Sequence, residues 1–231
     1  PISVTAPEKS FINARETAPC GGMAEVKFLI DSVVAAAMGQ VVPEMTVGDL
    51  KGGANHIHIA GPREDGGTYI HYEWPAGGTG ASVGVDGSNA VRSYNEGDFN
   101  SIQSVEMVEA QFPLRIERCE IRESACGDGE FRGGFGLRRD VKILGRTGAL
   151  SVLSEKNVIP PYGVEGGSNG AANSFTVIRD GEITQPSPVP GKVSGFPLKT
   201  GDVVREETAG GGGYGDPLKR DPELVRADVA E

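Results

Sequence analysis

Glycine is the residue that most limits what this chain can fold into. It occupies 35 of the 231 positions, or 15%, where about 7% is ordinary. Because glycine lacks a side chain, it favours tight turns, positive φ angles and close contacts between backbones. We therefore expect short strands joined by turns. The glycines follow no fixed period, and many gather in clusters at residues 77–80, 127–136, 163–170 and 210–215.

A glycine cluster can also bind phosphate through its backbone N–H groups. None of the four clusters is followed by the Lys-Ser or Lys-Thr of a Walker loop. None lies between a clear strand and a long helix, as a dinucleotide-binding fingerprint requires. The sequence therefore predicts turns and close backbone packing, and no nucleotide site on this chain.

Two segments have the pattern of helices. Apolar residues recur at i, i+3, i+4 and i+7 from Val26 to Met38, and Gly39 follows, so this segment predicts an amphipathic helix. A shorter helix is expected at Val105–Gln111, with Ser104 as its N-cap. The charged tail at 221–231 is compatible with a third, fraying helix.

Most of the remaining chain has the pattern of strands. Residues 57–60 and 68–74 flank a Gly-Pro turn and predict a β-hairpin. Further strands are expected at 114–121, 137–144, 150–154, 175–179 and 202–208. The predicted class is α+β and β-rich, with sandwich or barrel-like sheets and one or two amphipathic helices. We treat 1–231 as one unit, with a helix-containing part at 1–111 and a β-rich part at 112–231 as the alternative.

Charge and cysteine content limit the partners and the cellular compartment expected for the chain. Lys and Arg total 22 against 32 Asp and Glu, so the net charge is 22 − 32 = −10. An acidic surface repels nucleic-acid phosphates and anionic lipid, and no apolar run reaches 18 residues. We expect neither a nucleic acid nor a membrane as partner. Three scattered cysteines and no signal-like start favour the reducing cytoplasm.

The three histidines lie on or beside the predicted hairpin. Side chains at i and i+2 share a strand face, so His56 pairs with His58, and His71 pairs with Glu73. If the register aligned the two faces, these groups could hold a divalent metal. The alternative is a polar outer face of the hairpin, and the sequence leaves both open.

Other reactive residues give weaker signals. Cys20, Cys119 and Cys126 have no histidine nearby and are expected to be inert thiols. Arg132 precedes Gly133 and a second glycine, which leave its guanidinium free to reach a carboxylate or a partner backbone. The alternating charges around it are typical of a solvated strand face or a subunit contact.

Several ordered motifs together resemble one family. The motifs occur in this order along the chain: Tyr72–Glu73, Gly77–Ala81, Ser104–Glu106, Phe112–Arg118, Gly127–Gly136, Leu153–Lys156, Pro160–Gly167, Gly201–Val204 and Gly210–Pro217. This series is similar to the C-terminal part of the B subunit in the hydantoinase B/5-oxoprolinase family. The resemblance spans nearly all of residues 1–231.

The resemblance implies an enzyme that works only as part of a complex. A hydantoinase A-like subunit would bind ATP and Mg, and the complex would open a cyclic amide of the hydantoin or 5-oxoproline type. ATP would phosphorylate the carbonyl oxygen before water attacks. Two alternatives stay open: a subunit of an ATP-dependent ketone carboxylase of the acetone or acetophenone type, and a non-catalytic structural subunit.

The resemblance also implies partners and site residues. The remaining N-terminal part of the B subunit would complete a hetero-oligomer and would hold a divalent metal. Glu73 and Arg132, as catalytic residues, and the loop of Gly77, Gly78 and Gly80, as a substrate-binding backbone loop, are expected nearest the shared active site. Family members carry a histidine where this chain has Tyr94–Asn100, a difference that keeps the carboxylase alternative open.

Overall fold

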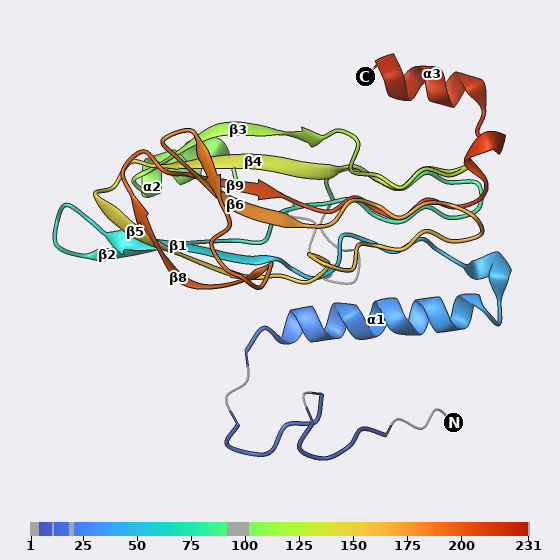
Figure 1. The fold of residues 1–231 in the computed structure, drawn as a ribbon, viewed down its shortest axis with the longest axis horizontal. Coiled ribbons are helices and arrows are strands. Elements are labelled where there is room, and N and C mark those ends of the chain that lie inside the picture. The colour runs from blue at the N-terminus through green and yellow to red at the C-terminus, as the bar shows by residue number, and fades with distance from the viewer. Residues whose placement is uncertain (1–4, 11, 19–20, 92–101, 231) are drawn as a thin grey trace.

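Two antiparallel sheets face each other in the computed structural model, which describes residues 5–10, 12–18, 21–91 and 102–230. The first sheet has the order β2 (Thr68–Glu73), β1 (His56–Pro62), β5 (Thr147–Leu153), β8 (Lys192–Lys199). The second has the order β3 (Leu114–Arg122), β4 (Gly136–Ile143), β9 (Val203–Glu207), β6 (Ser174–Arg179), β7 (Glu182–Thr184). Figure 1 shows them as two layers. The expected α+β class is confirmed, and within the described residues the sheets form a sandwich rather than a closed barrel.

The apolar core lies between these layers. Inward-facing residues of both sheets join one buried cluster, with Val108 of α2: Ile57, Ile59, Tyr69, Leu114, Val141, Ile143, Leu150, Val152, Phe175, Val177, Val193, Leu198 and Val204. Strand β1 pairs with β5, so the first sheet combines segments from both sides of residues 111 and 112. The division of the chain at that point stays a prediction.

The hairpin and the other five predicted strands are present, with ends that differ by a few residues. Two strands were missed. Strand β7 has only three residues, and β8 contains Gly195 and Pro197, residue types that weaken the strand pattern. β8 lies at the edge of its sheet, where a proline without an N–H is tolerated.

The described residues form three α-helices: α1 (Met23–Gly39), α2 (Val105–Gln111) and α3 (Pro222–Ala230), with 3₁₀ turns η1 (Pro43–Met45) and η3 (Pro217–Lys219). Both predicted helices are confirmed, and the Ser104 hydroxyl accepts a hydrogen bond from the Met107 N–H at 3.3 Å. The third helix, α3, forms in the charged tail, which the sequence left as a possible helix. No helix in this part of the chain has the length and apolar character to cross a bilayer.

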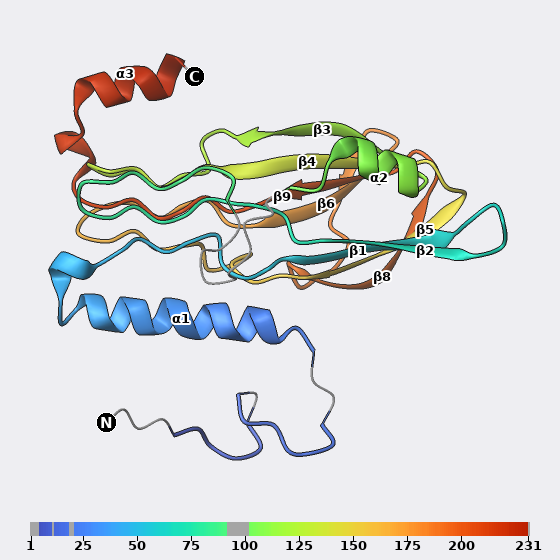
Figure 2. The same ribbon diagram turned by 180° about the vertical axis from the view of Figure 1, so that it is seen from behind.

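Beyond the strand ends, five extended segments run side by side without forming a sheet (Figures 1 and 2). We call residues 46–55, 76–91, 125–135, 161–171 and 208–215 the glycine bundle. Its buried centre is Gly210–Gly213. Three successive N–H groups of this centre donate to carbonyls of three different segments: Gly211 to Gly134 (2.9 Å), Gly212 to Asp49 (2.8 Å) and Gly213 to Ser168 (3.0 Å). The bundle is therefore held together by main-chain hydrogen bonds.

Only glycine fits the centre of the bundle, because the backbones touch. A Cβ on Gly211 would lie 1.8 Å from the carbonyl oxygen of Thr79, and one on Gly212 would lie 1.8 Å from that of Tyr162. These neighbours are backbone atoms that belong to other hydrogen-bonded segments, so they cannot move aside alone. The expected close backbone packing is confirmed at these positions.

Replacement of Gly211 by alanine tests this packing. We expect Gly211→Ala to lower the free energy of unfolding of the chain by about 3 kcal/mol, the upper end of the usual cost of overpacking a core. Urea unfolding followed by circular dichroism measures the change. Gly21→Ala is the matched control, since a Cβ there meets nothing within 4 Å. Equal stability of the two variants would contradict the packing argument.

Candidate functional site

The inward face of strand β2 carries charge into the core. His71 and Glu73 are both buried, and Glu73 Oε1 lies 3.1 Å from Nη1 of Arg139, on β4 of the opposite sheet. His71 Nε2 lies 3.4 Å from Glu73 Oε2. The Arg139 guanidinium also donates to the backbone carbonyl of Gln103. We call His71, Glu73, Arg139 and Glu206 the inter-sheet cluster.

Glu206 gives this cluster two carboxylates for one guanidinium. It lies on β9, directly across from Arg139 in the strand register. Neither of its carboxylate oxygens has a hydrogen-bond donor within the described part of the chain. Burial, and next the charge of Glu73, raise the pKa of Glu206 well above its ordinary value, and Arg139 only partly opposes this. The neutral form of the Glu206 carboxyl is therefore favoured over that of an exposed glutamate.

The cluster reaches a cavity through His71. This cavity, of about 350 Å³, lies between β2 and α2 and is lined by Ile70, His71, Tyr72, Gln103, Ser104, Met107, Val108, Gln111 and Phe112. Its wall includes the Gln103 residue that binds Arg139. The segment Tyr94–Asn100, which the sequence marks as different from the family, lies outside the described residues.

The other two histidines point away from the core. In the β1–β2 register, His58 lies opposite Tyr72 while His71 lies opposite Ile59, so the two predicted pairs occupy opposite faces of the hairpin. The alignment that the metal hypothesis required does not occur. No group of three His, Cys, Asp or Glu side chains within the described residues has the geometry of a metal site.

His56 and His58 instead join an aromatic cluster on the outer face. The His58 ring stacks on Tyr72 with centroids 4.4 Å apart, and His56 meets Trp74 edge-on at 5.1 Å. Burial lowers the pKa of both histidines, so they are neutral at pH 7. The alternative interpretation, a partly polar outer face of the hairpin, fits this arrangement.

A second polar network joins α1 to the body, and the sequence did not predict it. The Glu25 carboxylate accepts a 2.7 Å hydrogen bond from the Asn55 N–H and lies 3.7 Å from Nε2 of His56. Burial raises the pKa of Glu25 to about 7. Further along α1, the Ser32 hydroxyl donates a hydrogen bond to Asp49, which also pairs with Lys156. We call this set the α1 network.

The family motif Leu153–Lys156 contributes two residues to this network, but the sequence alone did not predict a role for them. Ser154 Oγ hydrogen-bonds to Asn55 Oδ1 at 2.8 Å, and the Lys156 ammonium reaches Asp49. Sequence spacing could not reveal these contacts, since about 100 residues separate the partners.

Arg132 lies in neither network. Its Nε donates to Asp228 of α3 at 2.7 Å, its Nη1 donates to Asn89 at 3.2 Å, and its guanidinium covers the Phe135 ring at 4.5 Å. Arg220 binds the same aspartate, Asp228. The expected reach of Arg132 to a carboxylate is present, and the carboxylate belongs to this chain.

The predicted loop at Gly77, Gly78 and Gly80 lies inside the glycine bundle. The N–H of Gly77 donates to Val91 and that of Gly78 to Ala209. A Cβ on Gly80 would lie 1.6 Å from the carbonyl oxygen of Gly48. The loop is packed against backbone on several sides, and its first two amides are already bonded, so it does not form a phosphate cradle.

The two described cysteines are free. Desolvation raises the pKa of Cys119, and it raises that of Cys126 to about 11. Both therefore remain protonated thiols at neutral pH, as expected for inert cysteines. Cys20 lies outside the described residues.

Comparison with known proteins links this arrangement to one family. The family model described as Hydantoinase B/oxoprolinase matches residues 1–217. An uncharacterized protein of Methanocaldococcus jannaschii, MJ0963, is 32% identical over 231 residues, which are 100% of this chain and 39% of that protein. The chain thus spans well under half the length of this relative.

Two solved structures share the fold. The ATP-dependent caprolactamase from Pseudomonas jessenii superposes with a TM-score of 0.81 at 25% identity, covering 98% of this chain and 40% of that one. Nucleotide-free acetone carboxylase gives a TM-score of 0.63 at 19% identity, covering 84% of this chain and 30% of that one.

The inter-sheet cluster predicts a specific pH dependence. Between the ordinary glutamate pKa and the raised pKa of Glu206, the folded chain holds a proton that the unfolded chain has released, so the free energy of unfolding falls as pH rises. Glu206→Gln removes this loss. We expect wild-type stability at pH 4.5 and a higher free energy of unfolding than wild type at pH 8.

Urea unfolding at both pH values measures this gain. Glu207→Gln is the control, because Glu207 is the next residue on β9 and pairs with Arg138 on the other face of the sheet. The control should show no gain at pH 8. A gain for Glu206→Gln that is the same at both pH values would contradict the protonated state.

The hydrogen bond from Arg132 to Asp228 should hold α3 against the rest of the chain. We expect Arg132→Ala to release α3 and to cost about 1–3 kcal/mol, the range for losing charged hydrogen bonds at a partly buried site. Faster hydrogen exchange in α3 reports the release. The control, Arg226→Ala, removes an exposed arginine of the same helix that pairs only within α3. Equal exchange in the two variants would remove Arg132 from the candidate residues.

Proposed function

The chain belongs to the hydantoinase B/oxoprolinase family, and we propose that it is a component of an ATP-dependent hydrolase of cyclic amides of the hydantoin or 5-oxoproline type. The observation that carries the proposal is the likeness to the ATP-dependent caprolactamase over nearly the whole chain. That protein is named for a lactam, which is a cyclic amide. The acetone carboxylase likeness, at 19% identity, supports the shared fold alone.

The proposed chemistry explains why ATP is needed. A lactam carbonyl is a poor electrophile, because the nitrogen donates electron density into it. Phosphorylation of the carbonyl oxygen makes the carbon electrophilic, so that water can add to it. The C–N bond of the adduct then breaks and the nitrogen leaves as the amine. Hydrolysis of the remaining acyl phosphate releases phosphate and leaves a carboxylate. Each ring opened would then release one ADP.

The described residues support a location of ATP and its Mg on a hydantoinase A-like partner subunit. A bound phosphate would need free backbone N–H groups. In the glycine bundle the N–H groups of Gly77, Gly78 and Gly211 already donate hydrogen bonds to backbone carbonyls. For the divalent metal, we propose the remaining N-terminal part of the B subunit. The complex would be a hetero-oligomer, and the free thiols fit a reducing compartment such as the cytoplasm.

Within this complex, Glu73 and Arg132 are proposed to act as positioning residues. Glu73 has 2% of its side chain exposed and holds Arg139, which in turn binds Gln103 at the wall of the cavity. Arg132 fixes α3 against the glycine bundle. The same internal pairing favours a second candidate function, a non-catalytic supporting subunit, in which these residues affect assembly alone.

Reconstitution tests the proposal. The chain, the A-like subunit and the rest of the B subunit are mixed with ATP, and ADP release is followed with hydantoin, 5-oxoproline or caprolactam, or with acetone and bicarbonate. We expect ADP release coupled to ring opening only when the chain is present, and none from the chain alone. ADP release that depends on ketone and bicarbonate would show a carboxylase instead.

Glu73→Gln separates the two remaining candidates. If the complex assembles fully but opens its cyclic amide at least tenfold more slowly, Glu73 positions the site. An unchanged rate in a fully assembled complex favours the supporting subunit. Turnover of ATP and a cyclic amide by the isolated chain would overturn the proposal.

A further inference from the structure

Helix α1 faces the body with its polar side. Glu25 and Ser32 are buried against the glycine bundle and its neighbours, where they make the hydrogen bonds of the α1 network. The apolar stripe of the predicted amphipathic helix points outward: Ile30 is 47% exposed, Val33 67% and Met38 54%. Among the large apolar side chains of α1, that of Phe28 is buried. The amphipathic helix is therefore present, but its orientation is the reverse of the usual one.

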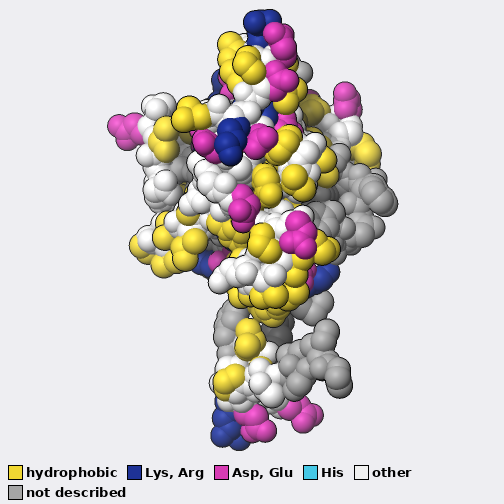
Figure 3. All heavy atoms as spheres, turned by 90° about the vertical axis from the view of Figure 1, so that its right-hand side faces the viewer, with side chains coloured by type: hydrophobic (Ala, Val, Ile, Leu, Met, Phe, Trp, Pro, Cys, Tyr) yellow, Lys and Arg dark blue, Asp and Glu magenta, His cyan; other side chains and the backbone are white. Residues whose placement is uncertain are grey.

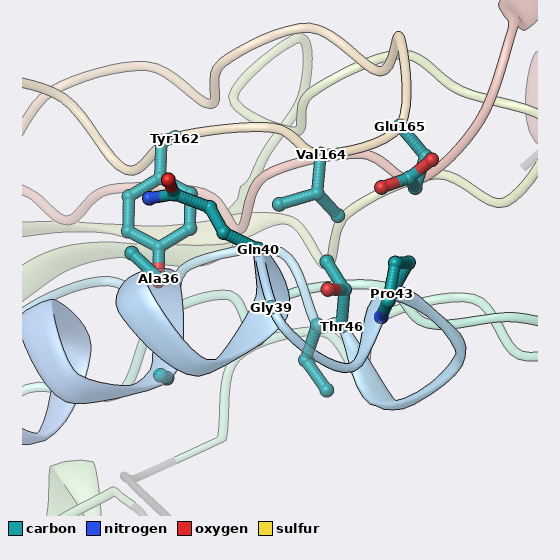
Figure 4. Close-up of a pocket in the computed structure, with 10 residues that line it drawn as sticks. Ala36, Gly39, Gln40, Pro43, Thr46, Tyr162, Val164 and Glu165 are labelled. Atoms are coloured by element: carbon teal, nitrogen blue, oxygen red, sulfur yellow. The ribbon is translucent and has the colours of Figure 1, made fainter.

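The inner side of α1 packs loosely. A cavity of about 450 Å³ separates its C-terminal half from the segment 162–165 (Figure 4). Tyr162 spans the gap and donates a 2.9 Å hydrogen bond to the Ser32 carbonyl. Gln40 and Glu165 lie at the cavity, and the rest of its lining is largely small or apolar. Contacts with the body alone thus bury little apolar surface of this helix.

The outward stripe continues beyond the helix. Val34 on α1, and then Val41 and Met45 after it, are more than half exposed. From Ser32 to Val42 the chain has no charged residue, although 23% of all residues are charged. We call Ile30, Val33, Val34, Met38, Val41 and Met45 the α1 outer face. A contiguous apolar surface rimmed by polar residues is typical of a protein interface.

The segment before α1 stands away from the body on the same side. The described residues from 5 to 18 are mostly exposed, and the hydrogen bonds of Ser10 and Asn13 stay within the segment. Figures 1 and 2 place this segment beyond α1, on the side opposite the sheets. In Figure 3 it forms a separate lobe, and hydrophobic side chains gather on the body above it. A binding partner in this position would contact both the segment and the helix.

We propose that the α1 outer face is the docking surface for the remaining part of the B subunit, a polypeptide that presents an apolar surface of its own. The chain supplies only 39–40% of the length of the MJ0963 protein and of caprolactamase, so such a polypeptide is the partner that the relatives provide in their own chains. A second copy of this chain fits less well, because it would bring a net charge of −10 against another −10. This inference rests on the proposed function, which names the same partner.

The double variant Val34→Glu with Met38→Lys tests the docking surface. Both positions are exposed and lie at i and i+4, so the new pair should support the helix and leave the net charge unchanged. The partner is the remaining part of the B subunit from the same source, made as a separate polypeptide in the reconstituted complex. We expect its affinity for the variant to fall at least 100-fold, because charges would enter an apolar interface.

Val225→Glu with Val229→Lys is the matched control, an equivalent exposed i, i+4 pair on α3. Its affinity should remain within twofold of wild type, and circular dichroism should be unchanged in both double variants. Wild-type affinity of the α1 variant would overturn the proposal. So would self-association of the wild-type chain that the α1 variant abolishes, since it would make a second copy the occupant.

The binding measurement uses neither ATP nor a cyclic amide. Loss of docking in the α1 variant therefore supports the surface even if the complex turns out to act on another substrate. Conversely, a complex that opens cyclic amides and assembles normally with the α1 variant keeps the proposed function and rejects the docking surface. The two proposals can fail separately.

Discussion

Direct contact between backbones in the glycine bundle is the constraint on which the rest of this structure depends. Segments that are far apart in the sequence meet at Gly210–Gly213, where hydrogen bonds run to three different neighbours. No side chain separates them, so the positions of the surrounding segments are fixed closely. Those segments carry Asp49 and Arg132 and lead into the strands that carry Glu73 and Arg139. The geometry of the inter-sheet cluster and of the α1 network therefore depends on this contact.

The buried charges follow a common logic. Removing a carboxylate from water is costly unless it is paired or protonated. Asp49 has Lys156 and Glu73 has Arg139, and burial raises the pKa of Glu206 well above its ordinary value, which favours its neutral form. Such groups face inward here, where they join elements to one another.

Local signals in the sequence were sufficient for the helices and most strands, because capping at Ser104 and alternation in the hairpin act between near neighbours. The family followed from several motifs in a fixed order. The orientation of α1 could not be predicted, since periodicity shows that a stripe exists but not which side the body covers. His71 and Glu73 were correctly paired on one face. Their partners Arg139 and Glu206 come from the other sheet, and only the tertiary fold brings them together.

The glycine bundle has one more consequence, for the energetics of the whole chain. When it unfolds, it exposes mainly peptide groups, whereas the sandwich exposes aliphatic side chains. Hydration of polar surface lowers the heat capacity and hydration of apolar surface raises it. The heat-capacity increment of unfolding per residue should therefore lie below that of a protein with an ordinary core. A smaller increment flattens the curve of stability against temperature, so this chain should lose stability slowly on both cooling and warming.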